Sequence, residues 1–426
     1  MITAVVSNEQ GEIFDLEGYA AVGMAGPDLF PLTREDTCSL PYGSELMRLP
    51  DRVPILYDMV SEEFEMIDKN PFQPDEDLFP VAAFNSPGHV VSSVCAYRER
   101  SFAQILPLFS YGAVGWYEDG FRSAAILVDE EPRQDLQLMK QEDVLHGIES
   151  MRRKLPGNRL RKHLEKCALE YGCPAGKNFF LGRFEAPLPT AKVCNAACLG
   201  CLSQQLDTEV PCSQERIKFT PDPEEIANVA LEHINRVENS VVSFGQGCEG
   251  DPLLAAAVIE PAIRMIRAQT DQGTINMNTN GGLPDILQQL LNAGLDSIRI
   301  SVNSVREDAY QAYFNPKGYV FRDVARSIDM ALDKGRHVAI NYLNMPGFTD
   351  TADELDKLVA FVEDNPINMI QWRNLNFDPI RYWQAMGQDA REEPVVGMQA
   401  VIETIRDQFP EVRHGYFNPP KLKRFA

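Results

Sequence analysis

From about residue 177 to residue 380, the sequence alternates short apolar runs with longer amphipathic stretches. The runs have the length of buried strands, and the stretches carry apolar residues at three- and four-residue steps, as helices do. The predicted strands are Phe179–Phe184, Ser240–Phe244, Thr274–Thr279, Ser297–Val302, His337–Leu343 and Met369–Leu375, and the predicted helices are 222–236, 253–269, 284–293, 306–314, 320–334 and 352–364. Alternating strands and helices form right-handed βαβ units and a parallel sheet. Six such units predict an α/β fold, a partial (βα)6 TIM-like barrel.

Two of the predicted strands carry polar residues at every second position, which is unusual for a parallel sheet covered by helices. These residues are Asn276, Asn278 and Asn280 around the third strand and Arg299, Ser301 and Asn303 around the fourth. Because side chains alternate across a strand, each set shares one face. In a barrel this face points into the lumen, where it can bind a polar ligand or form a structural network of its own.

The rest of the chain divides into three further regions. Residues 1–130 contain short apolar runs separated by Pro, Gly, Asn and Asp, which predicts a β-rich N-terminal domain. Residues 131–176 show helical periodicity interrupted at Pro156-Gly157, and we interpret them as a helical bridge. The barrel occupies residues 177–380, and residues 381–426 form a short C-terminal extension.

Composition limits where such a chain can work. The formal net charge of −22 argues against nucleic acid as a partner, because a nucleic-acid surface needs clustered positive charge. The longest apolar runs are far shorter than a bilayer span, and the N-terminus has no basic region followed by an apolar one. The nine irregularly spaced cysteines suit a reducing compartment better than a disulfide framework. We therefore expect a cytoplasmic protein without a membrane partner.

Three cysteines lie close together after the first predicted strand. Cys194, Cys198 and Cys201 have the spacing C-x3-C-x2-C. Soft sulfur ligands this close favour zinc or an iron–sulfur cluster. Structural zinc sites usually pair two half-sites, and the sequence contains no second C-x2-C pair and no H-x3-H pair. The spacing also differs from the ferredoxin run C-x2-C-x2-C, and three unrelated buried thiols are a further alternative.

This loop resembles the cluster-binding motif of the radical S-adenosylmethionine (SAM) superfamily. The resemblance implies that the three cysteines bind a four-iron four-sulfur (4Fe-4S) cluster, whose fourth iron is chelated by the amine and carboxylate of SAM. It also implies that one electron cleaves SAM to methionine and a 5′-deoxyadenosyl radical, which abstracts hydrogen from a substrate. An electron donor such as flavodoxin or ferredoxin is then an expected partner. Leu199 stands where the family commonly has an aromatic residue.

Further segments resemble the SAM-binding motifs of the same family. Gly245–Pro252 follows a strand and opens a helix, and its glycines let a ligand approach the backbone. Its Gly250-Asp251-Pro252 is similar to the family's Gly-Glu-Pro, and either Asp251 or Glu249 is expected to meet the SAM amine. Segments of the next three strands are similar to the corresponding family motifs: Asn278–Gly281, Ser301–Asn303, and Asn341 to Gly347 with Asp350. A Gly-x-Ile-x-Gly motif is not evident in the sixth strand. The resemblance implies that Gly247, Glu249, Gly250, Asp251, Asn280, Ser301, Asn303 and Asn341 bind SAM.

The sequence leaves the substrate and the catalytic side chains open. The N-terminal domain is the expected source of specificity, and its Tyr111, Trp116 and Phe121 could line a pocket or pack in the core. The other cysteines are interpreted as unliganded thiols, with Cys248 as a further ligand or an auxiliary cluster on Cys167, Cys173 and Cys212 as alternatives. The predicted function is a radical SAM enzyme. The alternatives are an iron–sulfur protein that transfers electrons or senses without cleaving SAM, and a zinc-stabilised binding protein.

Overall fold

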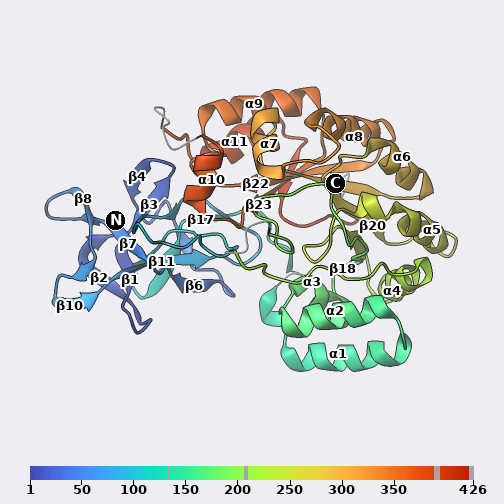
Figure 1. Ribbon diagram of the computed structural model, residues 1–426, viewed down its shortest axis with the longest axis horizontal. Helices are drawn as coiled ribbons and strands as arrows, with labels where there is room; N and C mark the ends of the chain where they lie inside the picture. Colours follow the sequence, from blue (N-terminus) through green and yellow to red (C-terminus); the bar gives the residue numbers. More distant parts are fainter. Residues whose placement is uncertain (133–134, 206–209, 388–393, 422–426) are drawn as a thin grey trace.

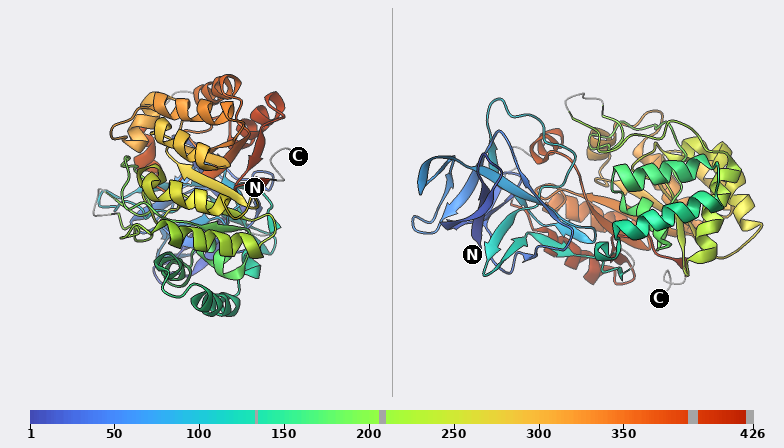
Figure 2. Two further views of the ribbon diagram at one scale, coloured as in Figure 1. Left: turned by 90° about the vertical axis from the view of Figure 1, so that its right-hand side faces the viewer. Right: turned by 90° about the horizontal axis from the view of Figure 1, so that it is seen from below.

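The protein folds into a β-rich part and an α/β part that lie side by side along the long axis of the molecule (Figure 1). The structure is a computed structural model that describes residues 1–132, 135–205, 210–387 and 394–421. In Figure 1 the β-rich part is on the left, the α/β part is on the right, and two helices of the predicted bridge lie below the α/β part. The view from below in Figure 2 shows the same arrangement.

The α/β part is built on a parallel seven-stranded sheet. Its strands are β18 (Glu185–Pro187), β19 (Val241–Phe244), β20 (Thr274–Thr279), β21 (Ser297–Val302), β22 (His337–Asn344), β23 (Met369–Asn374) and β24 (Arg413–Gly415). They pair in sequence order, and every neighbouring pair is parallel. The first and last strands do not pair with each other in the described part of the chain, so the sheet is an open half-barrel. The predicted partial barrel is confirmed.

Helices connect successive strands and cover the outer face of the sheet (Figure 1). They are α4 (Pro223–Arg236), the 3-10 helix η3 (Pro252–Ala255), α5 (Ala256–Arg267), α6 (Pro284–Ala293), α7 (Glu307–Phe314), α8 (Phe321–Asp333), α9 (Ala352–Asp364), α10 (Pro379–Ala385) and α11 (Met398–Gln408). Strong terminal signals explain why most of these helices are predictable. Asp222 and Glu225 form a capping box at the start of α4, Thr351 caps α9, and Gly294 ends α6 with a φ of 119°.

The first predicted strand is wrong, and the sheet has one strand more than predicted. Phe179 and Phe180 belong to the helix α3 (Pro174–Leu181), and the first strand is the short β18. Aromatic residues favour strands, but Pro174 at the first helical position and Gly182 after the last one, with a φ of 65°, select a helix. The additional strand β24 lies in the predicted C-terminal extension and pairs with β23. Three residues are too short for a periodic signal.

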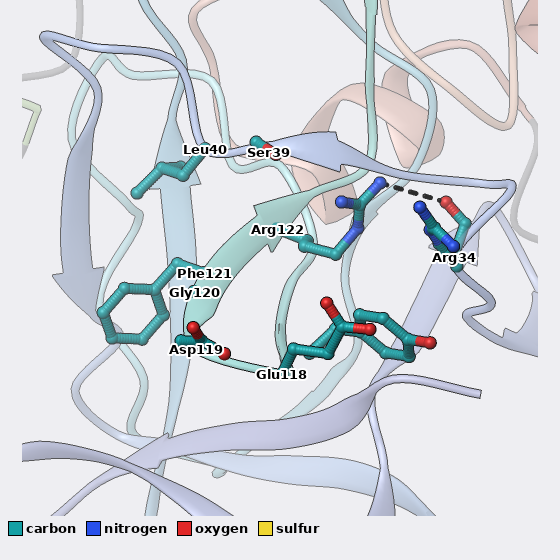
Figure 3. Close-up of a pocket in the computed structure, with 9 residues that line it drawn as sticks. Arg34, Ser39, Leu40, Glu118, Asp119, Gly120, Phe121 and Arg122 are labelled. Atoms are coloured by element: carbon teal, nitrogen blue, oxygen red, sulfur yellow. Dashed lines mark hydrogen bonds between the residues drawn. The ribbon is translucent and has the colours of Figure 1, made fainter.

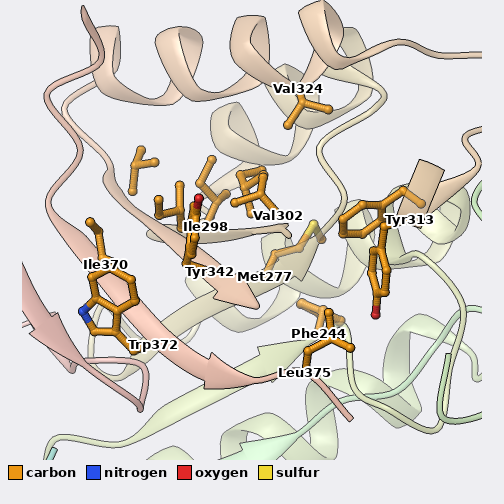
Figure 4. Close-up of a cluster of buried hydrophobic side chains, with 14 of the residues drawn as sticks. Phe244, Met277, Ile298, Val302, Tyr313, Val324, Tyr342, Ile370, Trp372 and Leu375 are labelled. Carbon is orange, nitrogen blue, oxygen red and sulfur yellow. The ribbon is translucent and has the colours of Figure 1, made fainter. Parts of the chain in front are cut away.

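An apolar core fills the space between the sheet and its helices (Figure 4). Ile298 and Val302 of β21 are fully buried, and Figure 4 shows them below Val324 of α8. Burying each such side chain contributes about 1.5–3 kcal/mol to stability. Arg299 and Ser301 occupy the alternate positions of β21 and are less buried. The predicted alternation of an apolar and a polar face is therefore present in this strand.

Three helices join the two parts of the molecule. They are α1 (Gln141–Lys154), α2 (Arg159–Glu170) and α3, and a short 3-10 helix, η2 (Leu136–Leu138), precedes them. The side chain of Asn158 caps α2 by accepting a hydrogen bond from the N–H of Arg161. The inner face of α2 buries Leu160, Leu164 and Cys167 against the rest of the protein. This face places the residues of α2 next to the barrel helix α4 (Figure 1).

Residues 1–127 form antiparallel β structure, as predicted. The strands are β1 (Thr3–Ser7), β2 (Ile13–Ala20), β3 (Val22–Ala25), β4 (Asp28–Pro31), β5 (Cys38–Ser39), β6 (Glu45–Arg48), β7 (Arg52–Asp58), β8 (Glu63–Met66), β9 (Lys69–Asn70), β10 (Gln73–Asp77), β11 (Phe79–Phe84), β12 (His89–Val91), β13 (Val94–Cys95), β14 (Tyr97–Glu99), β15 (Val114–Tyr117), β16 (Gly120–Ser123) and β17 (Ala125–Leu127). Ten of them form one branched sheet, and smaller sheets pack beside it.

The β-rich part contacts the carboxyl ends of β22 and β23. The side chain of Asn374 accepts a hydrogen bond from the N–H of Val91 at 2.8 Å, and Asn344 Nδ2 donates to the Val91 carbonyl at 2.7 Å. Gly347 lies against the backbone of Gly26, where a Cβ atom would be 2.1 Å from the Gly26 nitrogen. These contacts bring the β-rich part to the end of the barrel where the lumen opens. Among the described helices, none has the length and hydropathy needed to cross a membrane.

Candidate active site

The cysteine loop lies at the carboxyl end of the sheet, between β18 and α4. The end of α7 holds its backbone: the N–H of Ala197 donates to the Phe314 carbonyl at 2.9 Å, and that of Leu199 donates to the Tyr313 carbonyl at 3.0 Å. Gly200 approaches the same helix so closely that a Cβ atom would lie 2.9 Å from Tyr313 Oη. These contacts place Cys194, Cys198 and Cys201 on the wall of a cavity.

Burial changes the acidity of two of the thiols. It raises the pKa of Cys194 to about 11, with a smaller contribution from Asp251, and it raises the pKa of Cys198 well above its ordinary value. Arg216 approaches the third cysteine, with Nη2 at 3.5 Å from Cys201 Sγ. Without a metal, Cys194 and Cys198 therefore stay protonated at neutral pH. Metal binding at this loop must displace their protons, so metal affinity is expected to rise with pH.

Glu249 joins the glycine-rich turn Gly245–Pro252 to the start of the cysteine loop. Its carboxylate is 5% exposed and accepts four backbone N–H groups at 2.7–2.8 Å, from Thr190, Ala191, Gly245 and Gln246. Burial raises the pKa of Glu249 to about 7, and these amides act in the opposite direction by stabilising the charged form. Both carboxylate oxygens are occupied within the protein. Glu249 is therefore a positioning residue for the two loops.

Replacing Glu249 by Gln should destabilise the protein. The NH2 group of Gln cannot accept a hydrogen bond, so it would face two of the four buried N–H groups. Each buried donor left without a partner costs about 1–3 kcal/mol, which predicts a loss of about 2–4 kcal/mol in the free energy of unfolding, measured with urea. As a control, Glu260→Gln removes an exposed partner of Arg264 on α5 and should cost less than about 0.5 kcal/mol. Equal losses in the two variants would contradict the role given to Glu249.

Asp251 links the same turn to β20. Both of its carboxylate oxygens accept a hydrogen bond from Thr279 Oγ1 at 2.9 Å, and Oδ2 also accepts one from the N–H of Asn280 at 2.7 Å. The side chain of Asn280 in turn donates to Asn195 Oδ1 in the cysteine loop at 2.7 Å. The turn, the end of β20 and the cysteine loop are thus connected by a chain of buried polar contacts.

The cysteine loop, the glycine-rich turn and the barrel lumen enclose a cavity of about 320 Å³. Most of the predicted site residues line it: Cys194, Cys198, Cys201, Gly247, Glu249, Gly250, Asp251, Asn280, Ser301 and Asn341. The sheet register places Ser301 of β21 opposite Asn341 of β22, and Asn341 Nδ2 donates to Ser301 Oγ at 3.1 Å. The volume is within the range of small-molecule sites, roughly 300–1,000 Å³.

Two parts of the expected SAM site do not line this cavity. Asn303 does not line this cavity: it is fully buried, and its Nδ2 donates to the Ala309 carbonyl at 3.2 Å and to Tyr382 Oη at 3.1 Å. Strand β21 ends at Val302, so the alternation that predicted a lumenal Asn303 does not extend to it. The turn that contains Gly347 packs against the β-rich part and is also absent from the cavity wall.

Two features of the cavity bear on what it can hold. Asn341 Oδ1 is buried and has no hydrogen-bond partner among the described residues, so a ligand with a donor group would satisfy it. The sulfurs of Cys194, Cys198 and Cys201 do not all lie within 4.8 Å of one another, as the ligand atoms of another group of described residues do. Three soft ligands that stand apart suit the separate irons of a cluster better than one zinc ion.

Similarity to known proteins identifies the region that contains this cavity. Residues 188–362 match the family described as the radical SAM superfamily. Molybdenum cofactor biosynthesis protein 1 of Bos taurus is 27% identical over 221 residues, which are 51% of this chain and 31% of that protein. GTP 3′,8-cyclase of Thermodesulfovibrio yellowstonii is 26% identical over 192 residues, which are 42% of this chain and 56% of that enzyme. Residues 188–362 of this chain are therefore a radical SAM domain.

Members of the radical SAM superfamily bind a 4Fe-4S cluster and SAM, and a domain of this family indicates an enzyme. The chain covers less than two thirds of the length of either of these relatives. A solved structure of spore photoproduct lyase with bound AdoMet is 13% identical, with 60% of this chain and 94% of that chain covered. Its TM-score of 0.37 is too low to add to the assignment.

Three further residues of the cavity wall lie outside the radical SAM motifs and were missed by the sequence analysis. Tyr313, Phe314 and Arg216 line it, and the first two also supply the carbonyls that hold the cysteine loop. Tyr310 stacks on Phe314 with ring centroids 4.4 Å apart. The aromatic residues at the end of the predicted helix 306–314 were a signal for this packing. Their contact with a loop more than a hundred residues earlier depends on the tertiary structure.

A second hollow, of about 540 Å³, lies on the β-rich part (Figure 3). Phe121 and Arg122 of the β15–β16 hairpin line it, and Arg122 Nη2 donates to the Arg34 carbonyl at 3.2 Å. Of the three aromatic residues expected either to line a pocket or to pack in the core, Phe121 lies here, Trp116 packs edge-on against Phe121, and Tyr111 is buried in the core. The residues of this hollow and those of the cysteine cavity do not overlap in the described part of the chain.

Proposed function

We propose that this protein is a radical SAM enzyme in which Cys194, Cys198 and Cys201 hold a 4Fe-4S cluster at the mouth of the barrel. When bound and reduced by one electron, the cluster and SAM would supply a 5′-deoxyadenosyl radical that abstracts hydrogen from the substrate. The observation that supports this proposal is the shared cavity. The three cysteines of the family motif line the same 320 Å³ space as Gly247, Gly250 and Asn280, although they are far apart in the sequence.

The chain's own residues would bind and orient SAM. Because Glu249 and Asp251 are saturated by hydrogen bonds within the protein, we infer that both hold the backbone of the turn rather than the SAM amine. The backbone of Gly247 and Gly250 would then face the amino-acid part of SAM. The side chains of Asn280, Ser301 and Asn341 would bind its other polar groups, with the unpaired Asn341 Oδ1 as an acceptor. Asn303 is left out of this site.

The substrate would occupy a neighbouring cavity of about 400 Å³, which shares Gly247, Arg299 and Arg373 with the first one. Phe84 and Phe109 of the β-rich part contribute an apolar wall, so the N-terminal region would help to select the substrate. Neither Arg299 nor Arg373 forms an ion pair with a carboxylate among the described residues. Arg299 Nη1 donates to Gln371 Oε1 at 3.0 Å. Glu185 is the one carboxylate residue among the described residues that line this cavity, so the two guanidinium groups leave an excess of positive charge that favours a substrate with an anionic or carbonyl-rich group.

The reaction would also need an electron donor and a reducing environment. A small redox protein such as flavodoxin or ferredoxin is the expected donor, because the cluster would have to receive one electron from outside before SAM is cleaved. All nine cysteines are free in the structure, which suits a reducing compartment such as the cytoplasm.

Anaerobic purification followed by metal analysis tests the proposal. We expect a brown protein with about four iron atoms per chain that releases 5′-deoxyadenosine and methionine from SAM under reduction. A colourless protein with zinc in place of iron at this loop would contradict the proposal and favour the zinc-stabilised binding protein. A brown protein that never cleaves SAM would favour an electron-transfer or sensing role. Such a protein would not need the glycine-rich turn and the Asn280 contacts beside the cysteines.

A further inference from the structure

A second group of metal-ligating side chains lies where α2 meets the glycine-rich turn. The ligand atoms of His163, Cys167 and Cys248 all lie within 4.8 Å of one another. His163 Nε2 is 3.4 Å from Cys248 Sγ and 3.5 Å from Cys167 Sγ. Cys167 is 2% exposed and Cys248 is 5% exposed, whereas His163 is partly exposed. None of the three residues lines the cavity of the cysteine loop as described.

Local structure brings these three side chains together from two distant segments. His163 and Cys167 are four residues apart on α2, so their side chains lie on the same face of the helix. Cys248 belongs to the turn that follows β19, and its carbonyl accepts a hydrogen bond from the N–H of Ile217 at 2.8 Å. The helix therefore supplies two ligands and the turn supplies one, and the three ligand atoms converge.

We propose that His163, Cys167 and Cys248 bind one Zn²⁺ ion that clamps α2 to the glycine-rich turn. In a tetrahedral site with Zn–S and Zn–N bonds of about 2.3 and 2.1 Å, sulfur and nitrogen ligands lie about 3.6 Å apart. The observed separations of 3.4 and 3.5 Å need almost no adjustment. A water molecule can be the fourth ligand, because His163 is partly exposed.

The donor set selects the kind of metal. Imidazole and thiolate are borderline-soft ligands that suit zinc, whereas magnesium and calcium take oxygen ligands. A 4Fe-4S cluster presents a separate iron to each thiolate, so its ligands do not converge on one point as these do. Zinc binding releases the protons of the two thiols to solvent, and the neutral imidazole binds through Nε2.

The position of the site suggests what the ion would do. Cys248 directly precedes Glu249, which holds the two loops of the proposed SAM site. A bond from Cys248 to the metal would join this turn to α2, which precedes the barrel in the chain. The ion would thus be structural, and it would be independent of the cluster at Cys194, Cys198 and Cys201.

Metal analysis of a full-length variant without the cluster ligands tests the inference. In the background Cys194→Ala, Cys198→Ala and Cys201→Ala, we expect about one zinc per chain, as in a structural zinc site. Adding Cys167→Ser or His163→Ala should reduce zinc below about 0.2 per chain. Adding Cys212→Ser, which alters an exposed thiol, should leave the zinc content unchanged. Because the cluster is removed in all variants, the result does not depend on the proposed radical chemistry.

A second measurement guards against variants that fail to fold. Cobalt added to the metal-depleted, reduced background protein should produce the visible bands of tetrahedral Co²⁺ and a thiolate charge-transfer band, and Cys167→Ser should lose the latter. Zinc content that is the same with and without Cys167 would overturn the inference. Absence of both zinc and cobalt–thiolate absorption in a folded background protein would overturn it as well.

Discussion

The variant Cys198→Ala should keep its fold and release no measurable 5′-deoxyadenosine from SAM. Without Cys198, only two of the three thiolates remain to hold the cluster, which is too few in the proposed geometry. Loss of a residue that hydrogen-bonds to a ligand typically weakens metal binding about 10–100-fold, and loss of a ligand itself should weaken it more. The loop itself should persist, because backbone hydrogen bonds to Tyr313 and Phe314 hold it. Iron content, 5′-deoxyadenosine by mass spectrometry and the thermal unfolding curve measure the three parts of this prediction.

The matched control for this variant is Cys38→Ala. Cys38 lies on β5 in the β-rich part and does not line the cysteine cavity. The Cys38→Ala variant should retain the iron content and the SAM cleavage of the unmodified protein. Normal cleavage by Cys198→Ala would refute the ligand assignment, and loss of cleavage in both variants would show that the assay reports thiol damage rather than cluster ligation.

The variant Gly245→Ala should lose about 2–5 kcal/mol in the free energy of unfolding, the sum of about 1–2 kcal/mol for a left-handed residue and about 1–3 kcal/mol for overpacking. Gly245 has a φ of 79°, and a Cβ atom would lie 1.7 Å from the carbonyl oxygen of Asn278. That oxygen belongs to the backbone of β20, so the clash can be relieved only by moving the strand or the turn. Because the turn also contains Glu249 and Asp251, we expect SAM binding to weaken together with stability. Urea denaturation and equilibrium dialysis with SAM measure the two effects.

Gly318→Ala separates backbone strain from the close approach. Gly318 has nearly the same φ, 80°, but nothing lies within 4 Å of its Cβ position. The Gly318→Ala variant should lose only the contribution of the left-handed backbone, about 1–2 kcal/mol in the free energy of unfolding, and should bind SAM normally. The difference between the two variants is then the contribution of the contact between Gly245 and Asn278. Equal losses would show that the turn can move away from β20 without penalty.

The helices and most strands of the barrel could be predicted because their signals are local. A capping box at Asp222 and a glycine at position 294 mark helix ends within a few residues of sequence. Prediction failed where a local signal was ambiguous, as at Phe179-Phe180, whose β propensity yields to the proline and glycine that flank α3. The predicted end of the fourth strand at Val302 is correct, but the alternation was extended one residue beyond it to Asn303, whose side chain donates to the Ala309 carbonyl and to Tyr382 Oη.

The sequence by itself determined that the chain forms an α/β half-barrel with a cysteine loop after its first strand, since spacing and periodicity are properties of neighbouring residues. Only the tertiary structure decided what Glu249 and Cys248 contact. Glu249 binds amides just before the cysteine loop and in its own glycine-rich turn, and Cys248 lies beside a histidine and a cysteine of α2. The physical reason is that parallel strands bring their carboxyl ends together, so the loops that follow them meet although many residues separate them in the chain.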